Sequence, residues 1–274
     1  LSFEAPPLSQ IDSIQHKITP VVNNGSFQIL NSSASSTGIL PISPDVSICS
    51  DCLEELFSPQ DVRFRYPFIN CTNCGPRFTI IRVIPYDRPK TSMANFDLCQ
   101  TCLAEYKDPL NRRFHAQPVA CPECGPQVWL ESAKKPGVKI CEGDSALIKS
   151  QSLLKEGKIL AVKGLGGFHL ACNAEDEKVV QKLRKRKNRP AKPLAVMMPN
   201  LEVVAKHCRI SELEAEFLSS PQRPILLLAK KDDSTLTESI APGQNSLGVM
   251  LPYTPLHYLL FSSGADYPDA PYSV

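Results

Sequence analysis

The chain has 274 residues, of which 42% are hydrophobic and 21% are charged, and its formal net charge is +2. These values are ordinary for a globular protein, and the length suits about two domains. The sequence contains no run of 18 apolar residues. We therefore expect no transmembrane helix and no membrane partner.

The first residues, Leu1–Pro7, include neither an initiator methionine nor a signal-peptide pattern, so we expect a segment of a longer protein. Phe27–Leu30 alternates like a half-buried strand, and the serine-rich stretch Asn31–Thr37 follows it. Residues 1–35 are too few for a core of their own. We interpret them as the end of a preceding domain and a linker.

Eight cysteines dominate the next hundred residues. They form four C-x-x-C pairs separated by 18, 24 and 18 residues, so that the second half repeats the first at an offset of 50. Other matched positions include Glu55 with Glu105 and Arg63 with Arg113. We predict a tandem zinc-finger region over residues 36–135, with four cysteines per finger and these metal ligands: Cys49, Cys52, Cys71, Cys74, Cys99, Cys102, Cys121 and Cys124.

Two C-x-x-C turns can complete a tetrahedron of thiolates around one zinc ion, at Zn–S distances of about 2.3 Å. Four sulfur ligands leave no position for water or substrate, which predicts two structural Zn²⁺ ions rather than catalytic ones. Gly75 and Gly125 follow their second cysteines, where a tight knuckle often needs positive φ. Sequential use of the pairs is favoured because it respects the repeat, although an interleaved arrangement remains open.

Two other uses of these cysteines are less favoured. Disulfides would suit a secreted protein, yet nothing in the sequence indicates secretion. A redox motif needs one C-x-x-C beside a βαβ unit, not four in tandem. We interpret the three scattered cysteines, Cys141, Cys172 and Cys208, as buried small hydrophobes. Reduced cysteines of both kinds, zinc ligands and buried thiols, fit a reducing cytoplasm. His115 lies near sites that already have four sulfurs, so we expect a surface or packing role.

Short helices and strands are expected throughout the rest of the chain. From Gly143 onward the pattern becomes α/β, and Ile159–Val162 has the continuous apolar character of a buried strand. We predict helices over 51–57, 101–106, 146–156, 174–188, 211–219 and 255–261, and strands over 79–81, 128–130, 159–162, 168–171, 194–198, 225–229 and 247–251.

The glycine-rich stretch Lys163–Ala171 follows the predicted buried strand. It departs from the dinucleotide-binding fingerprint because the third glycine is missing and Phe168–Ala171 alternates like a strand. A tight turn and a ligand-binding loop are equally open for it.

A basic run, free of acidic residues, ends the predicted helix 174–188. Its members are Lys182, Arg184, Lys185, Arg186, Lys187, Arg189 and Lys192. A solvated face is one interpretation, but seven cations exceed what a helix dipole needs. Arg189–Pro193 breaks the helix and fixes cations beside the next strand, where α/β sheets commonly hold anionic ligands.

The zinc region resembles that of HypF-type carbamoyltransferases, which mature nickel–iron hydrogenases. The resemblance rests on the cysteine spacing and on Pro44-Asp45, Cys49–Cys52, Tyr66–Ile80, Pro85–Pro89 and Arg112–Ala116. Residues 140–274 resemble a YrdC-like domain through Lys163–Asn173 and Lys187–Leu194. The resemblance implies an α+β multidomain chain: an acylphosphatase-like remnant, tandem four-cysteine zinc-ribbon-like units and a twisted YrdC-like sheet.

The resemblance also implies a reaction. In this family carbamoyl phosphate is cleaved, the carbamate is adenylated with ATP and Mg²⁺, and the carbamoyl group passes to a cysteine of HypE. It becomes the cyanide ligand of the hydrogenase iron. By matching positions, Lys187 and Arg189 would bind ATP phosphates or carbamate, with Lys163 and Lys192 as weaker candidates.

Two departures from the family pattern bear on catalysis. The acylphosphatase catalytic loop and the transfer domain have no counterpart in the 274 residues. Ser262–Ala265 comes too early for the family's Ser-x-Asn motif and lacks its asparagine. We therefore expect an incomplete YrdC-like domain, and we leave independent enzyme activity open.

Two rival functions remain. The basic run could serve an RNA-binding YrdC-like module with zinc fingers, through salt-dependent phosphate contacts. A threonylcarbamoyl-adenylate synthase would share the YrdC-like fold, but those enzymes resemble only the second half of this chain.

Overall fold

A computed structural model describes residues 5, 8–9, 11–20 and 43–262. Residues 11–20 form neither helix nor strand. The predicted strand Phe27–Leu30 and the serine-rich stretch after it lie outside the described residues, as does the sequence after Ser262. Within the described ranges, every helix is too short or too polar to traverse a bilayer.

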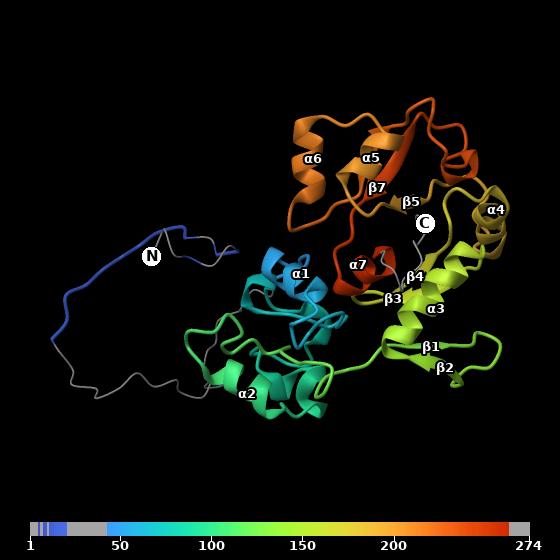
Figure 1. Cartoon of the computed structure of the whole chain (residues 1–274). Coiled ribbons are helices and arrows are strands. Elements are labelled where there is room, and N and C mark those ends of the chain that lie inside the picture. Colours follow the sequence, from blue (N-terminus) through green and yellow to red (C-terminus); the bar gives the residue numbers. More distant parts are fainter. Residues whose placement is uncertain (1–4, 6–7, 10, 21–42, 263–274) are drawn as a thin grey trace.

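The described chain consists of a finger pair followed by an α/β part (Figure 1). The elements, in order, are α1 (Ser50–Phe57), α2 (Gln100–Lys107), β1 (Trp129–Glu131), β2 (Lys139–Glu142), α3 (Gly143–Lys155), β3 (Leu160–Lys163), β4 (Phe168–Ala171), α4 (Glu177–Arg186), β5 (Ala195–Met197), α5 (Leu201–His207), α6 (Glu212–Ser219), β6 (Leu226–Ala229), β7 (Ser246–Met250) and α7 (Pro255–Phe261). This mixed content agrees with the predicted fold class.

The two finger helices begin at equivalent cysteines. The Sγ atom of Cys49 accepts the backbone N–H of Cys52 as the N-cap of α1, and Cys99 does the same for Cys102 at α2. A side-chain acceptor at this position satisfies an N–H that the helix itself leaves unpaired. The C-x-x-C knuckle therefore starts each helix and also turns two sulfurs toward one point.

One predicted strand in the finger pair is wrong. Residues 78–80 form a 3₁₀ turn instead, and Ile81 makes only an isolated bridge with Thr91. The preceding Arg77 donates from its guanidinium to the Val46 carbonyl and from its backbone N–H to the Tyr86 hydroxyl. These contacts hold the segment close to the finger, where no neighbouring strand is available for pairing within the described part of the chain.

Two antiparallel hairpins connect the finger pair to the main sheet. β1 pairs with β2, and β3 pairs with β4 so that Leu160 faces Ala171 and Lys163 faces Phe168. The prediction of a buried strand at 159–162 is wrong in its burial, since β3 alternates between half-buried and exposed side chains. A two-stranded ribbon leaves one face to solvent, and the apolar run did not reveal this.

The main sheet has the order β5-β7-β6, with β5 parallel and β6 antiparallel to the central β7. Val196 and Leu226 flank Val249 in register on one face of this sheet. That face joins the larger hydrophobic core together with residues of α4, α5 and α6. The sequence patterns of 194–198, 225–229 and 247–251 therefore predict these strands to within about one residue at each end.

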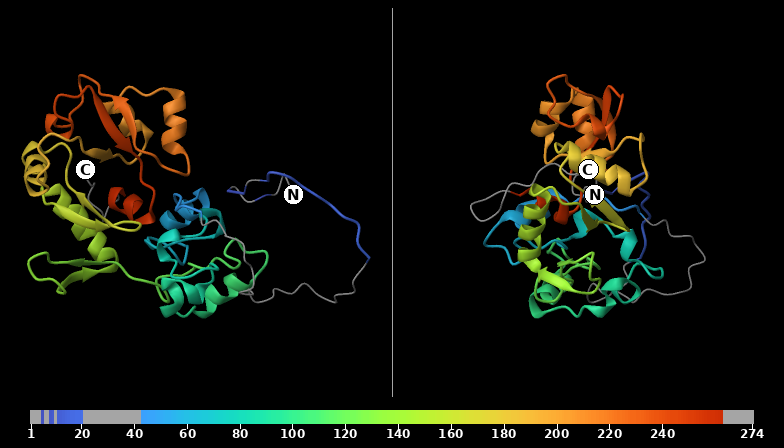
Figure 2. Two further views of the ribbon diagram at one scale, coloured as in Figure 1. Left: turned by 180° about the vertical axis from the view of Figure 1, so that it is seen from behind. Right: turned by 90° about the vertical axis from the view of Figure 1, so that its right-hand side faces the viewer.

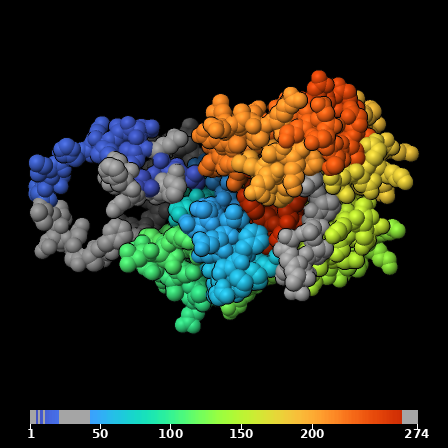
Figure 3. Space-filling model, turned by 45° about the horizontal axis from the view of Figure 1, so that its top comes forward, coloured from blue at the N-terminus to red at the C-terminus, as the bar shows by residue number. Residues whose placement is uncertain are grey.

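Helix α7 lies between the finger pair and the main sheet in both directions of view (Figures 1 and 2). Leu259 is fully buried in a second core that also contains Leu56 of α1 and Leu147 of α3. Gln151 of α3, also fully buried, donates to the carbonyls of Leu259, Leu260 and Ser262 at the end of α7. In the space-filling view the visible surface of α7, in dark red, lies between the first finger unit and the α/β part (Figure 3).

Candidate metal centres and basic loop

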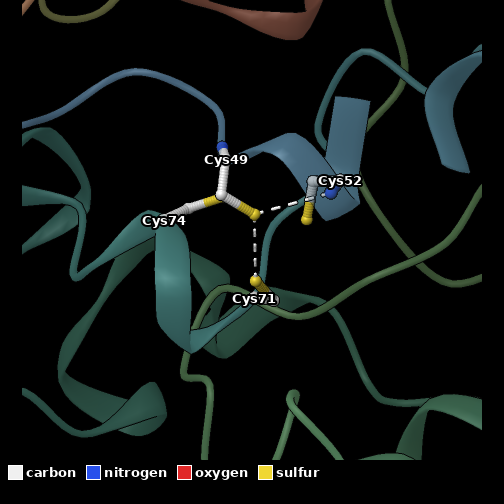
Figure 4. Close-up of side chains that lie close together, drawn as sticks. All are labelled: Cys49, Cys52, Cys71 and Cys74. Atoms are coloured by element: carbon white, nitrogen blue, oxygen red, sulfur yellow. Dashed lines mark hydrogen bonds between the residues drawn. The ribbon is translucent and has the colours of Figure 1, made fainter. Parts of the chain in front are cut away.

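The first thiol cage is built from the N-terminus of α1 and the 3₁₀ turn Thr72–Cys74 (Figure 4). Its sulfurs lie within 4.8 Å of one another, and the Sγ atoms of Cys49 and Cys71 are 3.6 Å apart. The backbone N–H of Cys49 also donates to the Sγ of Cys74 at 3.3 Å. Cys52, Cys71 and Cys74 are fully buried.

The second cage repeats this arrangement 50 residues later. The sulfurs of Cys99, Cys102, Cys121 and Cys124 also lie within 4.8 Å of one another. The Sγ of Cys121 is 3.7 Å from both the Sγ of Cys99 and the Sγ of Cys124. The structure thus gathers the thiols in sequential pairs, the first pair with the second and the third with the fourth.

The spacing of the sulfurs fits a tetrahedral zinc ion. A Zn–S distance of about 2.3 Å places the sulfurs of a regular tetrahedron about 3.8 Å apart. Two thiolates about 4 Å apart repel each other by about 4 kcal/mol at an effective dielectric constant of about 20. A divalent cation at the centre offsets that repulsion, so the donor set and its spacing are compatible with structural zinc.

Local hydrogen bonds lower the pKa of Cys71 and Cys74 in the first cage and that of Cys124 in the second, which favours their thiolate forms. Hydrogen bonds from Cys49 and Cys52 lower the pKa of Cys74 to about 7. Burial opposes ionisation of Cys124, but the backbone N–H groups of Cys99 and Cys121 bring its pKa down to about 7 overall. Since the thiolate is the metal ligand, these hydrogen bonds favour the form of the side chain that binds metal.

The two knuckle glycines serve different purposes. Gly75 has φ +71°, as predicted for a tight turn. Gly125 lies outside the left-handed region, so the expectation of positive φ is wrong there. A Cβ at Gly125 would lie 2.0 Å from the Tyr66 hydroxyl and 2.5 Å from the Ala120 Cβ. Close packing of the two finger units, rather than backbone conformation, requires this glycine.

The remaining cysteines differ in their surroundings. Cys172 and Cys208 are fully buried, and burial raises their pKa to about 12 and about 11, which makes them unreactive. Cys141 is only half-buried, with its Sγ 3.6 Å from the Ser145 carbonyl, so the prediction of a buried Cys141 is wrong. His115 is exposed and packs its ring 4.9 Å from Tyr106, in line with a packing role.

The basic loop, defined as residues 187–192, connects α4 to β5. Lys187 and Lys192 are exposed, whereas Arg189 is half-buried and donates to the carbonyls of Lys192 and Pro193. Arg184, only 6% exposed, donates to the carbonyls of Arg189, Pro190, Lys192 and Ile240. The sequence places Arg184 in the basic run with the surface cations, but its side chain is buried. Its hydrogen bonds to the backbone carbonyls fix the shape of the loop.

Lys163 lies on a different element, at the end of β3. It is exposed, with its Nζ 5.2 Å from the centre of the Phe168 ring. The glycines that follow form the turn of the β3–β4 hairpin, in which Gly164 donates to the Gly167 carbonyl and Gly166 has φ +73°. The tight-turn interpretation of this stretch therefore describes its backbone.

A small cluster of rings beside this hairpin escaped sequence analysis. The Tyr253 hydroxyl lies 2.9 Å from Nε2 of His169, and the rings of His257 and Tyr253 make an edge-to-face contact with their centres 4.6 Å apart. His257 is 4% exposed, and burial, together with His169, lowers its pKa to about 3. It is therefore a neutral imidazole at physiological pH. His169 lies 84 residues before Tyr253, so no local pattern in the sequence groups it with Tyr253 and His257.

Comparison with known proteins connects these features to a family. The model described as "HypF finger" matches residues 48–81 and 98–131, and the model described as "Telomere recombination", for Sua5, YciO and YrdC proteins, matches residues 152–267. The chain is 54% identical over 260 residues to carbamoyltransferase HypF of Synechocystis sp. and 47% identical over 272 residues to the probable carbamoyltransferase HypF of Methanocaldococcus jannaschii. The chain is similar to HypF carbamoyltransferases over nearly all of its length.

These relatives are longer proteins. The alignments cover 95% and 97% of this chain but 34% and 35% of the two HypF sequences, so the chain spans about a third of their length. Solved HypF structures share its fold. A full-length HypF in a phosphate- and nucleotide-bound form is 51% identical with a TM-score of 0.76, covering 86% of this chain and 30% of its own. HypF of T. kodakarensis is 48% identical with a TM-score of 0.79, covering 87% and 30%.

Proposed function

We propose that this chain contributes the zinc-finger and nucleotide-activating parts of a hydrogenase-maturation carbamoyltransferase. The observation that carries the proposal is 54% identity to a carbamoyltransferase across 95% of the chain, both fingers included. The division follows the sequence: residues 1–35 end an acylphosphatase-like domain, residues 36–135 form the tandem fingers, and residues 140–274 belong to a YrdC-like domain. A reducing cytoplasm suits the free thiols of the described residues.

In this proposal each cage holds one structural Zn²⁺ through its four thiolates. Metal bound in this way contributes folding energy and carries no reaction step, because the ligand set is closed. The first finger unit shares a core with α3 and α7. Holding its shape therefore also holds α7 against the α/β part.

The nucleotide role rests on the cations of the basic loop and on Lys163. The carbamate oxygen would attack the α-phosphorus of ATP, and pyrophosphate would leave as carbamoyl adenylate forms, with Mg²⁺ accompanying the nucleotide. Negative charge builds on the phosphates in that step, and fixed cations stabilise it. Lys187 and Lys192 are exposed for such contacts, and Arg184 fixes the backbone that presents them. A 51% identical full-length HypF has been solved in a phosphate- and nucleotide-bound form, which supports a nucleotide role for the proposal.

The later steps depend on partners that we also propose from the relatives. Carbamoyl phosphate would supply the carbamate, and a HypE-like protein would accept the carbamoyl group on a cysteine. The transfer would then provide the cyanide ligand of a nickel–iron hydrogenase.

Titration of the zinc-loaded chain with ATP and Mg²⁺ tests the nucleotide role. Loss of one charge-assisted contact costs about 1.5–3 kcal/mol, so Lys187→Ala and Lys192→Ala should each weaken ATP binding about tenfold or more. Lys178→Ala removes an exposed lysine from the first turns of α4 and serves as the control. Equal affinity in all four proteins would contradict the assignment.

RNA binding is a second candidate function because five cations of the basic run are exposed: Lys182, Lys185, Arg186, Lys187 and Lys192. RNA affinity that falls steeply with salt and disappears when Lys185, Arg186 and Lys187 are neutralised would favour it. Threonine-dependent release of pyrophosphate would instead favour a threonylcarbamoyl-adenylate synthase, whose family model matches residues 152–267 alone.

A further inference from the structure

Each finger unit sends an arginine into the thiol cage of the other. The guanidinium of Arg63, from the first unit, donates to the Sγ of Cys102 in the second cage at 3.2 Å. The guanidinium of Arg112, from the second unit, donates to the Sγ of Cys52 in the first cage at 3.1 Å. Cys52 and Cys102 are equivalent positions of the repeat, so equivalent sulfurs accept in the two cages, although the repeat matches Arg63 with Arg113 rather than with Arg112.

The matched arginines Arg63 and Arg113 also bind a carboxylate and a backbone carbonyl, and these contacts follow the 50-residue repeat. Arg63 pairs with Glu105 and donates to the Ala120 carbonyl at 2.9 Å. Fifty residues on, Arg113 pairs with Glu55 and donates to the Asn70 carbonyl at 3.3 Å.

Arg63 is 1% exposed and Arg113 is 3% exposed. Both side chains are therefore shielded from water in the packed finger pair, where an unpaired guanidinium would be costly.

The exchanged arginines lie in the loops that join the two ligand pairs of their own cages. Arg63 lies between Cys52 and Cys71, and Arg112 lies between Cys102 and Cys121. Fixing either guanidinium on the opposite cage therefore also fixes the loop that positions its own ligands. The backbone adds to this, because the N–H and the hydroxyl of Thr72 both donate to the Arg112 carbonyl.

Metal binding would set the net charge of the thiol cage to which each arginine donates. A divalent cation bound by four thiolates makes a cage with a net charge of about −2, and its sulfurs accept charge-assisted hydrogen bonds from guanidinium groups. Filling one cage therefore tightens its hold on the arginine from the other unit. That arginine's loop then presents the ligands of the second cage in the geometry that the metal needs.

We propose that the two cages bind zinc cooperatively, and that Arg63 and Arg112 carry the coupling between them. The proposal rests on the zinc role proposed above. The two arginines act as positioning residues, since neither is a metal ligand. Coupling between sites is reciprocal, so either cage filled first should favour the other to the same degree.

The test is a thermodynamic cycle on the full chain, made metal-free under reducing conditions and titrated with zinc against a chromophoric chelator. Cys49→Ser with Cys71→Ser disables the first cage, and Cys99→Ser with Cys121→Ser disables the second. The coupling is measured as a quotient of association constants. The overall constant for binding two zinc ions to the chain with both cages is divided by the product of the constants of the two variants that keep one cage each. We expect a quotient of about 5–150. A quotient of one in the chain with native arginines overturns the proposal.

Removing the arginines tests whether they carry the coupling. With Arg63→Gln and Arg112→Gln present throughout the cycle, the quotient should fall to one, and Arg82→Gln, at an exposed position, should leave it unchanged. A quotient that survives the double substitution overturns the proposal. If the double variant does not fold, Arg112→Gln alone, whose native side chain is 23% exposed, should still lower the quotient. A native chain that binds no zinc would instead refute the proposed zinc role itself.

Discussion

Protonation of His257 should make the stability of the protein depend on pH in a defined window. The imidazole is 4% exposed, its ring lies 4.6 Å from Tyr253 and 5.7 Å from His169, and burial with His169 lowers its pKa to about 3. An unfolded histidine has a pKa of about 6.5. Between these values the unfolded chain binds one more proton than the folded chain. Stability from this group is therefore complete above about pH 6.5 and is lost as the pH falls towards 3.

The size of the effect follows from the two pKa values. Between pH 7.5 and pH 5.5, wild type should lose about 1.4 kcal/mol of unfolding free energy through this one group. Urea denaturation of the zinc-loaded protein, at several pH values in this range, measures the loss. His257→Leu cannot take up the proton, so the stability difference between wild type and this variant should change by that amount.

His115→Asn controls for removing a histidine that stands beside aromatic rings but is exposed. Zinc release and the titration of other groups affect all three proteins and cancel in the comparison. A difference between wild type and His257→Leu that stays constant from pH 7.5 to pH 5.5 would refute the reasoning.

Two further predictions concern packing. Gly125→Ala should destabilise the chain by about 1–3 kcal/mol because the new methyl group would overlap the Tyr66 hydroxyl. Gly167→Ala is the control and should be much milder, since no atom lies within 4 Å of its Cβ position. Equal denaturation midpoints for the two variants would count against this packing. Leu259→Ala should cost about 2–5 kcal/mol, since Leu259 is fully buried between α7, α3 and the first finger unit. A loss below about 1 kcal/mol in urea denaturation would show that this junction packs loosely.

The sequence was informative where a local pattern determines local structure. The repeated C-x-x-C spacing predicts two gathered sets of thiols because each knuckle is built within four residues, and the first knuckle of each unit also caps a helix. Most helices and strands of the α/β part follow from apolar periodicity in the same way. Gly157, directly after the predicted helix 146–156, has φ +71° just beyond the end of α3. Helix α5 was missed, although Asn200 caps it through the Val203 N–H.

The sequence was less informative where distant residues decide. The repeat showed that Arg63 matches Arg113 and Glu55 matches Glu105, but not that each arginine crosses to the other unit. Arg184 carries no sign in the sequence that it points inward rather than outward with its basic neighbours. The partial exposure of β3 likewise depends on which strands lie beside it, and an apolar run does not specify its neighbours.

Metal content tests the central claim most directly. Protein purified without chelators under reducing conditions, then measured by elemental analysis against an accurate protein concentration, should contain close to two zinc ions per chain. Removing the metal should unfold the finger pair, because zinc in such cages contributes about 10–16 kcal/mol of apparent folding energy. A chain that contains no zinc and remains fully folded would contradict the account.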